Sequence, residues 1–248
     1  MGSAGWRLPR EPRPLRLDRL EFPDGLGVLV LAPHPDDFDE TGLTLRRLRD
    51  HGARFRLLVC SSSANGVEDG FVDPPTSEAK AAVREKEQRE SLAFFGLDPE
   101  AAAAFLRLPV DAAGGFLVAD PESLETVAAE TRAFGPDLVF LPHGRDTNPD
   151  HRLVFSWWRA IKAGLEGQAQ GLLFRDPKTV GLRSDAVFGF DEEDAEWKRR
   201  LLLHHRSQDA RNLRTRGHGF DERILRVNRA AAASLELELP YAEVFEID

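Results

Sequence analysis

Short apolar runs alternate with longer mixed segments along most of the chain. The apolar runs are bounded by turn residues, which is typical of strands that are buried on both faces of a sheet. The mixed segments carry apolar residues three or four positions apart among charged ones, which predicts helices with one buried face. The predicted strands are residues 25–32, 55–60, 105–110 and 137–142, and the predicted helices are residues 41–51, 77–96, 121–134 and 149–164. This alternation predicts a Rossmann-like α/β fold, with a mostly parallel sheet and helices on both faces.

Beyond residue 164 the alternation becomes less regular. We expect C-terminal extra strands at residues 172–174, 186–190 and 242–247, and extra helices at residues 192–205 and 222–235. Residues 1–24 are rich in Arg and Pro and are predicted to form a loosely ordered N-terminal arm. A single α/β core often reaches the length of this chain, so we expect residues 25–248 to form one domain.

The composition excludes several classes of protein. Hydrophobic residues make up 42% of the chain and charged residues 30%, which is typical of a globular protein rather than a disordered or fibrous one. The net charge of −9 disfavours a nucleic-acid partner, because such binding depends on Lys and Arg. The single Cys60 ends an apolar run and is expected to be buried and reduced, which excludes an intrachain disulfide and a cysteine metal cluster.

The sequence predicts neither a membrane span nor a secretory signal. No apolar segment approaches the roughly 20 residues that cross a bilayer. Residues 1–20 lack the apolar stretch that a secretory signal requires. We therefore expect a cytoplasmic protein.

The first chemically informative segment is the sequence His-Pro-Asp-Asp at residues 34–37, directly after the first predicted strand. Ligands of open parallel α/β sheets bind beyond the carboxyl ends of the strands, so this turn lies where the fold places function. The spacing of His34 and Asp37 lets one imidazole and one carboxylate face the same cation. Asp36 lies between them and is expected to point another way, which leaves its carboxylate uncommitted.

The second informative segment follows the fourth predicted strand and contains His151. It reaches the same edge of the sheet. If His151 joins His34 and Asp37, two imidazoles and one carboxylate leave an open coordination position, as in a catalytic zinc site. Each segment also has a structural alternative, namely a turn in which Asp39 or Thr41 caps the next helix, and a surface or capping role for His151.

Together these segments resemble the PIG-L/LmbE family of metal-dependent N-deacetylases. That family pairs a His-Pro-Asp-Asp turn after the first strand with a Pro-Asp-His turn after a later strand, and this chain has both, at residues 34–37 and 149–151. Three weaker stretches agree with the family: Arg84-x-x-Glu87 before Phe95-Gly96, His205-Arg206-Ser207-Gln208, and Tyr-Ala-Glu-Val-Phe at residues 241–245. The resemblance extends from about residue 27 to the end of the sequence.

The resemblance implies that His34, Asp37 and His151 bind the metal and that Asp36 is the general base. These roles agree with the chemistry of the residues. Zinc lowers the pKa of bound water to about 7. A nearby carboxylate that is not a ligand can then accept the proton as the water attacks an amide carbonyl.

The resemblance also implies that Arg84 and Asp111 contact a sugar substrate. Both positions have a plainer alternative. The alternative for Arg84 is an exposed arginine that pairs with Glu87 or Gln88 on a helix face. The alternative for Asp111 is an ordinary turn residue.

The chain departs from the family pattern at two places. Residues 38–42 replace the usual Glu and Gly-rich helix start, and Asn148 stands where many members have His. Asn can donate a hydrogen bond to an oxyanion but cannot deliver a proton. The departing amine therefore needs a proton from Asp36, the route we favour, or from a histidine, for which His205 and His143 are the candidates.

These features predict a zinc-dependent hydrolase that removes an N-acetyl group from an N-acetylglucosamine-type sugar or glycoconjugate. Asp36, Asn148 and His205 are its expected catalytic residues. Another divalent metal is compatible with the same ligands. The sequence also allows the protein to form a homo-oligomer. The alternatives are an amide or ester hydrolase that acts on a non-sugar conjugate, and a metal-binding or carbohydrate-binding module without catalysis.

Overall fold

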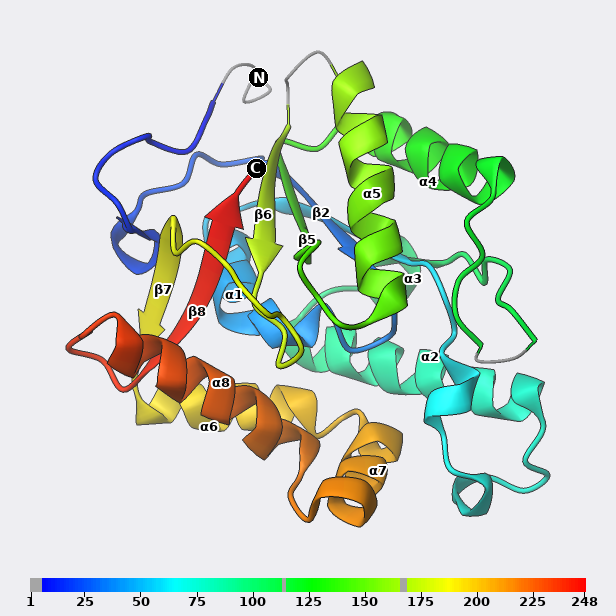
Figure 1. Ribbon diagram of the computed structural model, residues 1–248. Coiled ribbons are helices and arrows are strands. Elements are labelled where there is room, and N and C mark those ends of the chain that lie inside the picture. The colour runs from blue at the N-terminus through cyan, green and yellow to red at the C-terminus, as the bar shows by residue number, and fades with distance from the viewer. Residues whose placement is uncertain (1–5, 113–114, 166–168) are drawn as a thin grey trace.

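The computed structural model describes residues 6–112, 115–165 and 169–248, and these form an α/β fold around one sheet (Figure 1). The strand order is β1-β7-β8-β6-β5-β2-β3-β4. All neighbouring strands are parallel except that β8 runs antiparallel to β6 and β7. The strands are β1 Leu15–Arg16, β2 Gly27–Ala32, β3 Arg54–Val59, β4 Ala103–Phe105, β5 Leu138–Pro142, β6 Gln170–Phe174, β7 Ala186–Phe190 and β8 Tyr241–Ile247. The predicted mostly parallel sheet is confirmed.

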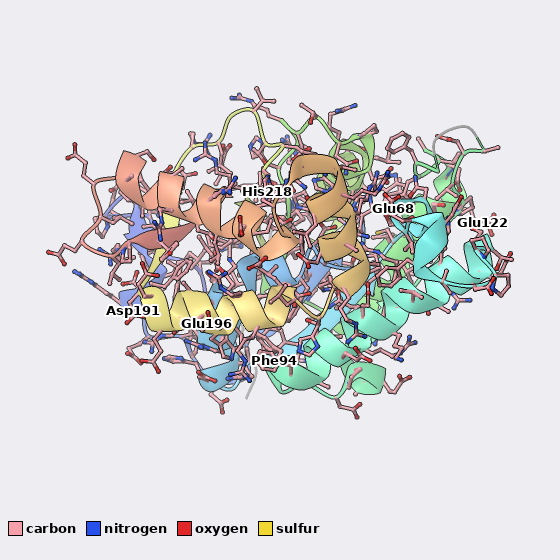
Figure 2. All side chains as sticks on the ribbon, turned by 90° about the horizontal axis from the view of Figure 1, so that it is seen from below. Glu68, Phe94, Glu122, Asp191, Glu196 and His218 are labelled. Carbon is pink, nitrogen blue, oxygen red and sulfur yellow. The ribbon has the colours of Figure 1, made fainter. Side chains whose placement is uncertain are left out.

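Helices cover both faces of the sheet, as the sequence predicts. The helices are α1 Gly42–Asp50, α2 Ser77–Phe95, α3 Pro99–Ala102, α4 Pro121–Phe134, α5 Pro149–Gly164, α6 Glu192–Leu202, α7 Arg206–Arg216 and α8 Phe220–Ser234. Short 3-10 turns lie at η1 Leu17–Arg19, η2 Asp39–Thr41, η3 Ala64–Gly66 and η4 Asp69–Phe71. Helices α4 and α5 pack on one face, α1 and α2 lie on the other, and α6 to α8 cross one end of the sheet (Figures 1 and 2).

The alternation of side chains along β2 separates two hydrophobic cores. Val28 and Val30 point to the face of α1 and α2, where Leu45 is buried. Leu29 points to the opposite face, where Trp158 of α5 is buried. Because successive strand residues face opposite sides, a fully apolar strand is required to fill both cores.

The order of the strands places an opening beside β2. From β2 the chain continues through α1 to β3 on one side, whereas β5, which follows α4, lies on the other side of β2. The carboxyl ends of β2 and β5 therefore meet at a switch point, which is where open α/β sheets bind ligands. The residues after both strands are those that the sequence analysis singled out.

Several boundaries differ from the sequence prediction. The helices predicted at 121–134 and 149–164 are confirmed, but the strand predicted at 105–110 is observed as Ala103–Phe105. The helix predicted at 192–205 ends at Leu202, and the sequence analysis missed α7, which begins four residues later. The short elements β1 and α3 were missed as well.

The predicted N-terminal arm is not loose where the structure describes it. Residues 15–16 pair with β7 as the parallel strand β1. Leu8, Leu17 and Phe22 are buried in the core cluster that includes β2. Residues 1–5 of the predicted arm lie outside the described residues. Apolar burial and backbone pairing therefore attach residues 6–24 to the sheet, and this expectation was wrong for them.

A buried glutamate of the last strand binds both the first helix and a lysine of α6. Glu243 of β8 accepts hydrogen bonds from the backbone N–H groups of Leu43 and Thr44, at 3.0 and 2.8 Å, and so caps α1. Its carboxylate also binds the fully buried Lys198 of α6 at 2.7 Å. The same ammonium donates to the backbone carbonyl of Glu40 at 2.6 Å. This network fixes the chain segment between the His-Pro-Asp-Asp turn and α1.

Replacing Glu243 with Ala is expected to destabilise the fold by about 3–5 kcal/mol, because it leaves a buried cation without its counter-ion. Urea denaturation measures the free energy of unfolding. Glu238→Ala is the matched control, since its side chain is 90% exposed and should change stability by less than about 0.5 kcal/mol. The double variant Lys198→Met/Glu243→Gln should recover part of the loss, whereas near-native stability of Glu243→Ala would contradict the assignment.

Candidate metal centre and active-site pocket

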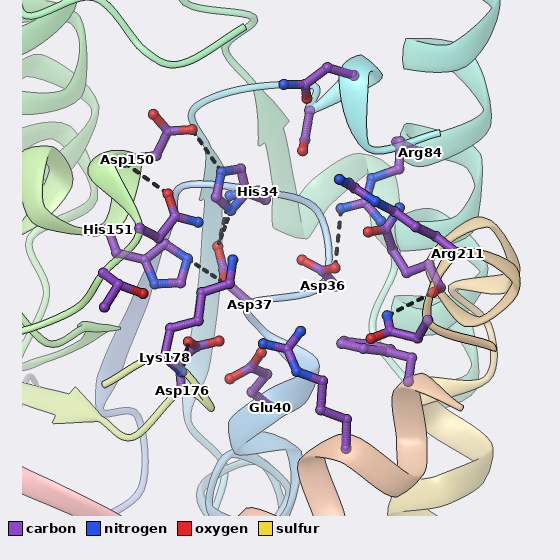
Figure 3. Close-up of a pocket in the computed structure, with 18 of the residues that line it drawn as sticks. His34, Asp36, Asp37, Glu40, Arg84, Asp150, His151, Asp176, Lys178 and Arg211 are labelled. Atoms are coloured by element: carbon purple, nitrogen blue, oxygen red, sulfur yellow. Dashed lines mark hydrogen bonds and ion pairs between the residues drawn. The ribbon is translucent and has the colours of Figure 1, made fainter. Parts of the chain in front are cut away.

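A pocket of about 350 Å³ opens at the carboxyl ends of β2 and β5 (Figure 3). Its volume is within the usual range of small-molecule sites. Six predicted site residues line this pocket: His34, Asp36, Asp37, Arg84, Asn148 and His151. The fold therefore brings together residues from three separate parts of the sequence.

The three predicted metal ligands converge in this pocket. Each of His34, Asp37 and His151 offers one ligand atom, and these atoms lie within 4.8 Å of one another. Nδ1 of His34 lies 3.6 Å from Oδ2 of Asp37, and Nε2 of His151 lies 3.5 Å from Oδ1. Two imidazoles that face one carboxylate fit a divalent metal of the zinc type.

A second carboxylate lies behind each of the two histidines. Asp150 is 2.8 Å from Nε2 of His34, and Asp146 is 3.3 Å from Nδ1 of His151. Each carboxylate also accepts a backbone N–H, from Leu117 at 2.8 Å and from Asn148 at 2.7 Å. Such carboxylates orient an imidazole and fix which nitrogen faces a metal. The sequence analysis missed their roles, although both aspartates belong to the segment after β5.

A second group of metal-ligand type shares His151. Asp146, His151 and Asp176 also offer atoms within 4.8 Å of one another. This set has only one imidazole, that of His151, whose Nδ1 faces Asp146. The set of two histidines and Asp37 is richer in nitrogen and suits zinc better.

Asp36 and Asp37 point in opposite directions. The backbone of Asp36 has a φ of 117°, a value that residues other than Gly rarely adopt. Its N–H donates to Gln88 at 3.0 Å, and its carboxylate accepts from Arg84 at 3.1 Å. In Figure 3 Asp36 turns toward Arg84, whereas Asp37 turns toward the histidines. The Asp36 carboxylate thus points away from the metal ligands, as expected, but it is paired with Arg84 rather than uncommitted.

The two structural alternatives for the turn are excluded. Asp39 is fully buried and lies 2.5 Å from Nε2 of His205, so it does not cap α1. The Thr41 hydroxyl donates to the carbonyl of Phe38, and its side chain makes no cap hydrogen bond with α1. His151 is 3% exposed and is therefore not a surface residue.

Arg84 is not on an exposed helix face. Its side chain is 1% exposed and donates to the carbonyl of Pro35 and to Asp36. The guanidinium Nε and Nη1 are buried without a hydrogen-bond partner among the described residues. Glu87, the alternative partner, instead caps α7 by accepting from the N–H and hydroxyl of Ser207, both at 2.7 Å.

Asn148 lies at the pocket with one side of its amide engaged. It is the N-cap of α5, and Oδ1 accepts the N–H of Asp150 at 3.0 Å. The side-chain NH₂ is therefore the part of Asn148 that is available as a donor to a ligand. This position of the NH₂ group agrees with a role of Asn148 as a hydrogen-bond donor to an oxyanion, and an amide cannot deliver a proton.

Three other candidates do not line this pocket. His205 is fully buried beside Asp39, and its Nδ1 has no hydrogen-bond partner among the described residues. His143 is occupied at both nitrogens, by Glu246 at 3.3 Å and by a backbone N–H at 2.8 Å. Asp111 lines a neighbouring hollow that shares Asn65 with the pocket.

Glu40 is a pocket residue that the sequence analysis did not assign. It lines the pocket and is 7% exposed, and its Oε2 has no hydrogen-bond partner among the described residues. Burial, together with Asp176 and Asp37, raises the pKa of Glu40 well above its ordinary value. The only hint in the sequence is its position three residues after Asp37.

Neighbouring charges set the protonation of the site. Burial alone lowers the pKa of His151, but Asp37 and Asp146 raise it to about 9. Burial raises the pKa of Asp36, yet Arg84, His205 and other cationic groups bring it below its ordinary value. At neutral pH and without a metal, His151 is therefore protonated and Asp36 is ionised.

Comparisons with known proteins agree with this site. The sequence pattern of the family described as GlcNAc-PI de-N-acetylase (PIG-L) matches residues 29–162. No curated protein matches the chain in sequence.

Solved structures share the fold at low sequence identity. The chain is similar to N,N'-diacetylchitobiose deacetylase from Pyrococcus horikoshii, with a TM-score of 0.72 and 19% identity over 91% of this chain and 84% of that one. It is also similar to GalB, the 4-carboxy-2-hydroxymuconate hydratase from Pseudomonas putida KT2440, with a TM-score of 0.70 and 17% identity over 90% and 95% of the two chains. A zinc-inhibited form of the teicoplanin deacetylase Orf2 has a TM-score of 0.67 and 16% identity over 90% and 98%.

Asp150→Asn and Asp146→Asn are each expected to weaken zinc binding by about 10–100-fold, because a histidine ligand loses the carboxylate that orients it. Competition with a fluorescent zinc chelator measures this affinity. Asp69→Asn is the control, since that carboxylate is 85% exposed and pairs with Lys80. Unchanged affinity in both variants would show that these carboxylates do not support the ligands.

Zinc binding is expected to release about one proton at pH 7, because a ligand histidine must be neutral and the pKa of His151 is raised to about 9. Apparent affinity should rise with pH and level off above pH 9. Titration calorimetry in buffers of different ionisation enthalpy measures the protons released. Asp146→Asn removes a group that raises this pKa and should release fewer, whereas no release from the unaltered protein would contradict the assignment.

Proposed function

Because the chain belongs to the GlcNAc-PI de-N-acetylase (PIG-L) family, whose pattern matches more than half of its 248 residues, we propose that it is a metal-dependent hydrolase of an N-acetyl amino sugar. The observation that carries this proposal is the opposite orientation of two adjacent carboxylates. Asp37 faces His34 and His151, whereas Asp36 is left as an ionised base in the same pocket.

The metal would be held by His34, Asp37 and His151, with Asp150 and Asp146 behind the two imidazoles. When bound, a divalent cation supplies Lewis acidity, which lowers the pKa of water and polarises an amide carbonyl. We propose zinc because its preferred ligands match this set. Other divalent ions belong in the test, since a neighbouring structure is the zinc-inhibited form of its enzyme.

Asp36 is the proposed general base. It lines the pocket, and its pKa lies below the ordinary value, so it can accept a proton from the attacking water at neutral pH. Arg84 and Gln88 hold its carboxylate and its backbone, respectively. After accepting the proton, the same carboxyl can return it to the nitrogen of the departing amine. Acetate and a free amino sugar are then the products.

Asn148 is the proposed donor to the carbonyl oxygen. Its Oδ1 is engaged by the start of α5, so its NH₂ group is the part that can stabilise developing negative charge. For the departing amine we favour Asp36 over His205 as the acid, since His205 is buried beside Asp39 and is not among the pocket residues. We propose for His205 an indirect role, in which it helps to lower the pKa of Asp36.

Substrate contacts are proposed for two further residues. The buried, unpartnered Nε and Nη1 of Arg84 are suited to donate hydrogen bonds to a polar group of the sugar. Asp111 can contact only a substrate that extends past Asn65 into the neighbouring hollow. An amino sugar is favoured because the family and two similar structures are described as acting on N-acetylated sugars or glycoconjugates.

Other functions on the same fold are tested together with the proposal. GalB is described as a hydratase, so the fold does not by itself determine the reaction. An amide hydrolase of non-sugar conjugates and a binding module without catalysis are the two remaining alternatives. The first alternative predicts products from substrates without a sugar, and the second predicts binding without any product.

The metal-loaded protein is expected to release acetate from N-acetylglucosamine and its glycosides, since the pocket combines a metal site with a free base. Enzymatic acetate detection measures this release with zinc, cobalt and manganese, and after removal of the metal by a chelator. Asp36→Asn is expected to lower kcat by about 10²–10⁴, whereas the control Asp69→Asn should not change it. Release from N-acyl amines without a sugar, or binding of sugar without release, would replace the proposal with one of the alternatives.

A further inference from the structure

Two arginines of the C-terminal helices line the pocket without a counter-ion. Arg211 of α7 and Arg223 of α8 both belong to the pocket lining. Neither forms an ion pair or a side-chain hydrogen bond with any residue that the structure describes. Their half-buried positions differ from those of ordinary surface arginines, which are exposed to solvent.

The acidic residues next to these arginines on α8 and beside the pocket pair with other cations. Next to Arg211, Glu68 pairs with Arg214 at 2.6 Å and Asp69 pairs with Lys80 at 2.5 Å. On α8, Asp221 pairs with Arg199 and Glu222 pairs with Arg226, at 3.1 and 3.0 Å. In the pocket, burial raises the pKa of Glu40 and Arg223 lowers it, but neither Arg211 nor Arg223 forms an ion pair with a carboxylate that the structure describes. The nearby carboxylates therefore leave the hydrogen-bond donors of both guanidinium groups unused.

Arg84 adds a third guanidinium to the same pocket. It is 1% exposed, and its Nε and Nη1 are buried without a partner among the described residues. Figure 3 shows Arg84 and Arg211 on the side of Asp36 that lies away from His34 and His151. The pocket thus has a metal-ligand side and a basic side, with Asp36 between them.

Arg211 and Arg223 both act on a further arginine of α7, Arg216, which does not line the pocket. Burial lowers the pKa of Arg216, and Arg223 and Arg211 lower it further. Lys178 also lines the pocket, but it lies on the side of His34 and His151 in Figure 3, so it is not counted with these arginines. An anion placed among the guanidinium groups would relieve their repulsion and fill unused donors.

We propose that Arg211, Arg223 and the free nitrogens of Arg84 form a subsite for an anionic group of the substrate, a phosphate or a carboxylate. Arg211 and Arg223 lie outside residues 29–162, so the family match does not include them. Which part of the substrate this subsite binds rests on the proposed function. When the N-acetyl group lies at the metal ligands, the charged substituent extends toward α7 and α8. A planar guanidinium fork matches the oxygens of either anion.

Binding of glucose 1-phosphate, compared with methyl glucoside, tests the subsite by titration calorimetry. These probes carry no N-acetyl group, so the measurement stands even if deacetylation is not the reaction. The full-length protein should bind the phosphate at least about tenfold tighter, the effect of one charged hydrogen bond. Glucosylglycerate, with a carboxylate, shows which of the two anions is preferred.

Arg211→Gln and Arg223→Gln are expected to remove most of this preference. Arg214→Gln on α7 and Arg226→Gln on α8 are the matched controls, because both arginines are exposed, pair with a glutamate and do not line the pocket. The preference should persist after the metal is removed. Equal affinity for the two sugars, an equal loss in the controls, or a preference that disappears with the metal would each overturn the subsite.

Discussion

The reversed backbone at Asp36 is the constraint on which the site depends. Successive residues of an ordinary turn would present two carboxylates to the same ion, where their charges would repel. At a φ of 117° Asp36 turns away from Asp37 and meets Arg84. One carboxylate can therefore face the histidines while its neighbour pairs with Arg84. Such backbone strain persists only where surrounding contacts determine it.

Those contacts come from helices that lie far away in the sequence. Gln88 of α2 accepts the N–H of Asp36 and donates to Asp39, and Asp39 in turn binds His205. Glu87, one residue earlier on α2, caps α7 through Ser207. A single helix thus holds the turn on one side and the C-terminal helices on the other. Two of the three weaker sequence stretches that resemble the family, those at residues 84–87 and 205–208, are physically connected through these bonds.

The sequence predicts the site where the chemistry is local and misses it where the partner is distant. The His-Pro-Asp-Asp turn and His151 could be predicted because each directly follows a recognisable strand or begins a helix. Asp146 and Asp150 could not be assigned, since their role depends on which imidazole nitrogen each one faces. The packing of residues 6–24 and the cap of α1 by Glu243 were not foreseen either, because their partners lie far away in the sequence.

The opposite roles of the two adjacent aspartates are tested most directly by the zinc content of Asp36→Asn and Asp37→Asn after removal of excess metal. Inductively coupled plasma mass spectrometry measures the zinc content of each variant. Together with the turnover rate, it distinguishes a base from a ligand. The account predicts that Asp36→Asn keeps about one zinc per chain and loses turnover, whereas Asp37→Asn loses the zinc. Zinc retained by Asp37→Asn and lost by Asp36→Asn, with normal turnover per bound metal in the latter, would contradict it.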